Sequence, residues 1–233
     1  MCNPTIVRRT YDMRRTYDAL RGISREELAN SITHGLGILL TLIGLPILAA
    51  HSWMHNNMVH TGAVIVFGFS LLSVYVSSTL HHVATHARLK RIALTLDHAC
   101  IYVLIAGTYT PFLVSTMRGM AGGLLLAAIW TMGLAGILWK VLFRVPRSWR
   151  HELISVGFYL LMGWLILLVL EPFVSAVALP GILLLLAGGL CYSFGVVFFL
   201  IGNVAYAHAV WHLFVLTGSV LHYFSVLWYA VPS

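Results

Sequence analysis

Charged side chains are scarce in this sequence. Asp, Glu, Lys and Arg together make up 9% of its 233 residues, whereas globular domains carry roughly 25%. The apolar set AVILMFWYC makes up 60%, more than one water-soluble core of this size could hide from solvent. The composition therefore excludes an ordinary soluble domain, and we expect lipid to surround most of the chain.

Cysteine is also scarce. Cys2, Cys100 and Cys191 are scattered along the chain and show no paired spacing. A disulfide framework is typical of an even number of cysteines, and a thiolate metal site is typical of closely paired ones. The sequence supports neither, so any metal site has to be built from histidine and carboxylate side chains.

Long apolar segments take up most of the sequence, and each is close to the 20 residues that a membrane-spanning helix needs. They lack the alternation of polar and apolar residues that is typical of membrane β-barrels. We therefore predict an all-α, polytopic membrane protein with seven transmembrane helices in 27-233, preceded by a basic tail, 1-26, that does not resemble a cleavable signal peptide. The predicted segments are 32-52, 59-80, 94-116, 121-143, 152-171, 177-200 and 204-230.

The cations predict the orientation, because Lys and Arg in short connections stay in the cytoplasm. Six arginines lie in the tail, three cations lie between the second and third segments, and four flank the connection between the fourth and fifth. We therefore expect a cytoplasmic N-terminus and an external C-terminus in the plasma (inner) membrane. Because these cations lie at membrane edges, the net charge of +7 indicates anionic lipid headgroups as partners rather than nucleic acid. The repeated RRTYD at 8-12 and 14-18 is interpreted as part of a flexible basic tail.

Histidines recur at the ends of apolar segments. His208 and His212 are one helical turn apart on one face of the seventh segment, and Ser219 continues that face. Ser78 precedes His82 by one turn at the end of the second segment. The predicted topology brings these ends, and the start of the third segment with Asp97, to the cytosolic side.

Three imidazoles and a carboxylate at one depth indicate a zinc site with an open position, which is typical of catalytic zinc. An HxxxH pair alone is a weak signal, because such pairs more often line a polar cavity or lie at a wet interface. No carboxylate lies between His208 and His212, so Asp97 is the candidate general base, and Ser78 is the candidate hydrogen-bond donor to the reacting groups. The structural alternative for Asp97 is a charge that stabilises the start of a helix.

The first helix presents polar residues on one face as it enters the membrane. Glu27, Asn30 and His34 share this face. We expect them, with Ser219, to line the metal cavity or to support the ligands. The alternative is an ordinary hydrogen bond between helices.

Four stretches of the sequence together resemble the hemolysin III branch of the progestin and adipoQ receptor family. They are EELANSITHGLG at 26-37, SSTLHH at 77-82, LDHACIYVLIAGTYTPF at 96-112 and HAVWHLFVLTGS at 208-219. The resemblance implies seven helices, a cytosolic N-terminus and zinc near the cytosolic face. It also implies His82, His208 and His212 as ligands, with Asp97 beside the metal-bound water. Bacterial members commonly resemble STLYH at the second motif, so His81 stands as an alternative ligand to His82.

The resemblance leaves the function open between two classes. Family members are linked to hormone signalling, to ceramidase-like hydrolysis and to membrane lipid and energetic homeostasis. We therefore expect either a zinc-dependent hydrolase of a lipid amide or ester, or a non-catalytic membrane sensor with a structural zinc. A pore-forming cytolysin is disfavoured, because the intramembrane polar residues gather at one end whereas a pore needs a polar lining throughout.

Overall fold

The computed structural model describes residues 23–55, 58–117, 119–142, 149–201 and 204–230. The basic tail predicted at 1-26, including both copies of RRTYD, lies outside these residues except for its last part, 23–26. The division of the chain at residue 26 therefore stays a prediction.

The described residues are almost entirely helical and contain no strand. Seven stretches are long and apolar enough to cross a membrane, which confirms the prediction of an all-α, multi-pass integral membrane protein. The elements are α2 (Arg25–His55), α3 (Met58–Val83), α4 (Ala87–Ser115), α5 (Met120–Leu142), α6 (Trp149–Gly163), the 3-10 helix η1 (Leu165–Val169), α7 (Leu170–Ala176), α8 (Leu179–Leu200), α9 (Ala207–Ser225) and the π-helical turn η2 (Val226–Ala230).

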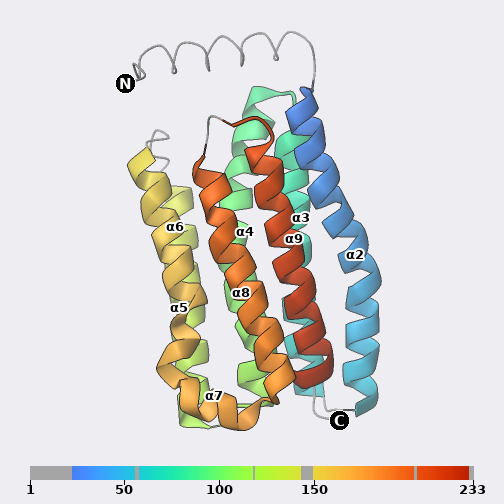
Figure 1. The fold of residues 1–233 in the computed structure, drawn as a ribbon, viewed down its shortest axis with the longest axis vertical. Helices are drawn as coiled ribbons and strands as arrows, with labels where there is room; N and C mark the ends of the chain where they lie inside the picture. The colour runs from blue at the N-terminus through green and yellow to red at the C-terminus, as the bar shows by residue number, and fades with distance from the viewer. Residues whose placement is uncertain (1–22, 56–57, 118, 143–148, 202–203, 231–233) are drawn as a thin grey trace.

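The helices form one elongated bundle (Figure 1). Helix α3 packs between α2 and α4, and α5 packs on the other side of α4. Helix α9 packs between α8 and α2, so the last span of the chain lies beside the first. This arrangement brings the start of α2, the end of α3, the start of α4 and the start of α9 together; we call this the histidine end of the bundle.

The fifth span differs from the prediction. We expected one uninterrupted helix over 152-171, but α6 stops at Gly163 and the chain continues through η1 into α7. The Tyr109 hydroxyl on α4 donates to the Gly163 carbonyl oxygen at 2.8 Å and accepts from the Ile166 N–H at 3.0 Å. A helix can break inside a membrane where another group satisfies the freed backbone, and Tyr109 does so here.

Small residues allow α4 and α5 to approach closely. The fully buried Tyr102 ring on α4 lies directly over Gly136 of α5, where a Cβ atom would come within 2.5 Å of the ring. One turn earlier, a Cβ at Gly133 would make only ordinary contacts, the nearest at 3.6 Å. Gly136 is therefore required by packing against an aromatic ring, and Gly133 is not.

Candidate metal centre

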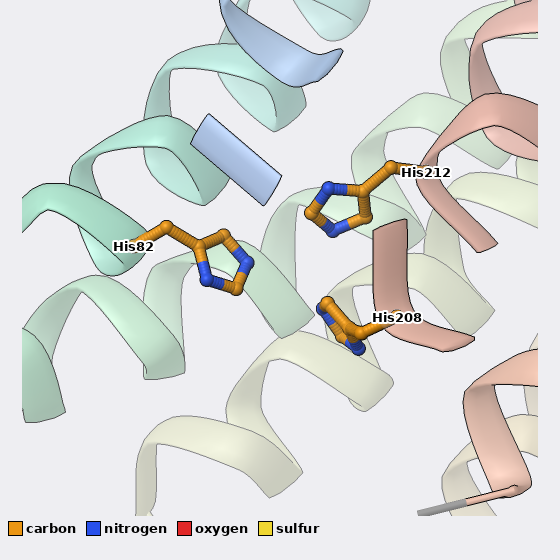
Figure 2. A group of neighbouring side chains, drawn as sticks. All are labelled: His82, His208 and His212. Carbon is orange, nitrogen blue, oxygen red and sulfur yellow. The ribbon is translucent and has the colours of Figure 1, made fainter. Parts of the chain in front are cut away.

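Three histidines meet at the histidine end of the bundle. His82 lies in the last turn of α3, and His208 and His212 lie in the first turns of α9. One nitrogen from each ring lies within 4.8 Å of the other two. Figure 2 shows the three rings turned toward one another across the space between α3 and α9. His82 and His212 are buried, and His208 is half-buried.

Helix α2 fixes the orientation of His82. The Nδ1 atom of His82 hydrogen-bonds to the Glu27 carboxylate, whose other oxygen accepts from Lys90 Nζ at 2.6 Å. Because a carboxylate accepts hydrogen bonds, Nδ1 carries the proton and Nε2 keeps its lone pair. His82 Nε2 is buried and has no hydrogen-bond partner. A carboxylate bonded to the far nitrogen is the usual support of a metal-ligating histidine.

Helix α2 also orients His212. The Nδ1 atom of His212 lies 3.1 Å from the main-chain oxygen of Asn30 and 3.1 Å from Thr33 Oγ1. A carbonyl oxygen only accepts, so Nδ1 again carries the proton and Nε2 remains available as a ligand. The His34 ring stacks on His212 with ring centroids 3.6 Å apart, which restricts rotation of the ligand ring.

The residues fit a divalent metal. Neutral imidazoles that donate through Nδ1 and present Nε2 are the protonation state that a metal needs. Zinc binds imidazole nitrogens at about 2.0–2.1 Å, and small side-chain rotations would bring three nitrogens already within 4.8 Å to a common ion. His82, His208 and His212 would hold it, and their number leaves a fourth position open.

Asp97 and Ser78 belong to the lining of the cavity at this cluster. The Ser78 hydroxyl is next to the Asp97 carboxyl but has no completed hydrogen bond and is fully buried. Unpaired buried hydroxyls are costly unless another group binds them. The two side chains predicted to act on a substrate therefore line the cavity that contains the histidine cluster.

The cavity extends far beyond the histidines and has a volume of about 1580 Å³. Along α4 it reaches from Asp97 to Phe112, a distance of about 22 Å at the rise of an α-helix. Most of its wall is apolar, and residues of α4, α6, η1, α7 and α8 contribute to it, including Leu113, Ile166, Phe173, Ile182 and Leu186. A long apolar cavity with a few polar groups at one end suits a lipid chain with a polar head.

The remaining candidate site residues differ in whether they contact the histidine cluster. Glu27, Asn30 and His34 contact ligand histidines, as described above. Ser219 does not: its hydroxyl pairs with the Tyr192 hydroxyl at 2.8 Å, and it lines a smaller cavity of about 150 Å³. His81 lies next to His82, but its Nδ1 is 3.2 Å from the Lys90 carbonyl oxygen, and the three histidines that could hold a metal include His82 and not His81.

Sequence reasoning missed two supporting residues. Lys90 was read only as a charge that sets topology, although it binds the carboxylate that orients His82. Thr33 was not considered. A signal for the first existed: Glu27 and Lys90 carry opposite charges and are both expected at the same end of the bundle.

The comparison with protein families bears on the same region. The model of the family described as "Haemolysin-III related" matches residues 23–223. The chain belongs to this family. The match confirms the resemblance to the hemolysin III branch, and it spans every described residue of the histidine cluster and of the cavity's polar end.

Family relatives resemble the chain over nearly their whole length. "Hemolysin-3" of Bacillus cereus is 44% identical over 209 residues, which are 90% of this chain and 94% of the relative. "Hemolysin-3 homolog" of Bacillus subtilis (strain 168) is 41% identical, over 89% of this chain and 95% of the relative. The human "Monocyte to macrophage differentiation factor" is 30% identical, over 89% of this chain and 86% of the relative.

Proposed function

We propose that this membrane protein binds zinc through His82, His208 and His212 and hydrolyses an amide or ester bond of a membrane lipid at the cytosolic face. The role fits membrane lipid homeostasis. One observation carries the proposal: the histidine cluster, Asp97 and Ser78 line the polar end of an apolar cavity long enough for an acyl chain.

Each residue of the site has its own role in the proposed hydrolysis. Zinc held by three imidazoles supplies Lewis acidity toward a carbonyl group and toward water. Asp97 accepts a proton from the attacking water as the new carbon–oxygen bond forms. The same carboxyl then returns the proton to the nitrogen or oxygen that leaves. Ser78 donates a hydrogen bond to the carbonyl oxygen as negative charge develops on it.

A membrane sensor with a structural zinc is the second candidate. It is favoured by the way the cluster joins helices, because the ligands lie on α3 and α9 and their hydrogen-bond partners lie on α2. Closed structural sites usually hold four protein ligands. The group found among the described residues has three, and a large cavity reaches it, so the hydrolase is the better supported of the two.

Metal content and turnover test the proposal together. Metal is measured by mass spectrometry on detergent-purified wild type, on the triple variant His82→Ala/His208→Ala/His212→Ala and on Asp97→Asn. We expect about one zinc per chain in the wild type, almost none in the triple variant and near wild-type zinc in Asp97→Asn. Hydrolysis of ceramides and phospholipid esters should fall about 10²- to 10⁴-fold in Asp97→Asn, the usual contribution of a general base.

The outcomes separate the candidates. No zinc in wild type purified without chelators, or wild-type zinc in the triple variant, refutes the ligand assignment. Zinc without turnover of any amide or ester supports the sensor instead.

A further inference from the structure

One of the histidines that line the large cavity lies far from the metal cluster. His222 is on α9, ten residues beyond His212, and so about 15 Å further along the helix. It lines the same cavity as the metal cluster, and only 8% of the residue is exposed. It takes no part in the metal centre, and the proposed hydrolysis gives it no role.

The two ring nitrogens of His222 have different surroundings. Nε2 lies 3.0 Å from the main-chain oxygen of Leu185 on α8. That oxygen can only accept, so Nε2 carries the proton and Nδ1 is an acceptor. Nδ1 is buried and has no hydrogen-bond partner. His222 Nδ1 is therefore an acceptor that lacks a hydrogen-bond donor.

Packing holds the ring in this orientation. A Cβ atom at Gly188 would overlap the imidazole, so the glycine is what lets the ring lie against α8. One turn further along α8, the Tyr192 ring meets the imidazole edge to face, with ring centroids 5.3 Å apart. The acceptor is fixed in place before any ligand arrives.

Other polar groups of this part of the cavity have hydrogen-bond partners of their own. Trp164 Nε1 donates to Ser193 Oγ at 3.1 Å, and Ser193 Oγ donates to the Gly189 carbonyl oxygen at 2.8 Å. The Tyr192 hydroxyl pairs with Ser219. None of these hydrogen bonds reaches His222 Nδ1, which has no partner among the described residues although His222 lines the cavity.

We infer that the cavity binds an acyl chain that carries a hydroxyl group partway along its length, and that His222 Nδ1 accepts the hydrogen bond from this hydroxyl. The inference rests on the proposed function, which places the polar head at the histidine end and the chain in the cavity. A hydroxyl far from the head would otherwise be unpaired among apolar side chains, so one fixed acceptor selects such chains over unsubstituted ones.

Competition binding tests the inference. The full-length protein in detergent is loaded with a fluorescent fatty acid, which is displaced by stearate, by a hydroxystearate with its hydroxyl at mid-chain, or by one with its hydroxyl next to the carboxyl. We expect the mid-chain compound to bind about 3- to 10-fold more tightly than stearate, the usual gain from one buried hydrogen bond. The compound substituted next to the carboxyl should gain nothing from His222.

Two variants locate the effect. His222→Phe keeps a ring of similar size without the acceptor, so it should bind stearate as the wild type does and lose the preference for the mid-chain hydroxyl. Ser225→Ala is the matched control: Ser225 also hydrogen-bonds from α9 to a carbonyl oxygen of α8, that of Gly181 at 2.8 Å, but it does not line the cavity. It should keep the preference. His222→Gln, which retains an acceptor, is the substitute if His222→Phe does not fold, and it should retain part of the preference.

Equal affinity of the wild type for stearate and the mid-chain compound overturns the inference and leaves the proposed function standing. A preference that persists in His222→Phe does the same. If none of the three fatty acids displaces the probe, the lipid cavity and the inference built on it both fail.

Discussion

Removing the Glu27 carboxylate should weaken metal binding without removing a ligand. Glu27 holds the Nδ1 proton of His82, which leaves Nε2 free for the metal. In Glu27→Ala the nearest remaining partner of Nδ1 is the Asn30 amide nitrogen, 3.5 Å away. That group donates, so it favours the opposite tautomer, in which Nε2 carries the proton and cannot bind a metal.

The size of the loss follows from this exchange of tautomers and from burial. Loss of such a supporting partner typically costs 10- to 100-fold in metal affinity. His82 is 5% exposed, so water can replace little of the lost hydrogen bond. We therefore expect Glu27→Ala to weaken zinc binding about 100-fold, which corresponds to about 2.8 kcal/mol at 1.4 kcal/mol per tenfold. Glu27→Gln keeps an oxygen acceptor and should lose about tenfold. Lys90→Met removes a partly exposed ion pair and should cost at most about 1 kcal/mol.

Zinc affinity is measured by competition with a chromophoric chelator on the purified protein. Glu26→Ala is the control, because it removes the neighbouring exposed carboxylate of the same helix. If Glu26→Ala and Glu27→Ala weaken zinc binding equally, the effect comes from surface charge and the reasoning about the tautomer is refuted. The same conclusion follows if Glu27→Ala binds zinc as tightly as the wild type.

Three further predictions concern the fold and the choice of ligand. Tyr109→Phe leaves the carbonyl and N–H groups at the helix break unpaired and should lower the free energy of unfolding by about 1–3 kcal/mol, seen as a lower Tm in detergent; an unchanged Tm contradicts the role given to the hydroxyl. Gly136→Ala forces a methyl group against an aromatic ring and should destabilise by about 1–3 kcal/mol, whereas Gly133→Ala should be close to neutral; equal effects would show that ring contact is not the cause. His81→Phe should retain zinc and His82→Ala should lose most of it; the reverse result would mean that His81, and not His82, is the ligand.

The sequence predicts the spans well because each depends on local composition. A run of about 20 apolar residues needs no knowledge of its neighbours to be read as a membrane helix. The break after Gly163 is different, because the residues around it are as apolar as the rest of the span and the group that stabilises it, Tyr109, lies 54 residues away. Local hydropathy therefore predicts one helix where the structure has two.

The candidate site shows the same division. Helical periodicity places His208 beside His212, and the predicted topology brings His82 to them, so the approach of the three rings could be expected from sequence. The hydrogen-bond partners of the Nδ1 atoms of His82 and His212 could not be expected from sequence. The main-chain oxygen of Asn30 has no signature in the side-chain pattern, and the pairing of Glu27 with His82 depends on the packing of α2 against α3.

The close approach of the first and last spans has a consequence for biosynthesis. Glu27 and Asn30 emerge from the ribosome early, whereas His208 and His212 follow only after five further spans. Domains generally form from the N-terminus as synthesis proceeds, so a chain that still lacks α9 carries one of the three clustered histidines, His82. The cluster of three histidines is therefore complete only after the seventh span has docked, and the proposed metal site is among the last features of the fold to form.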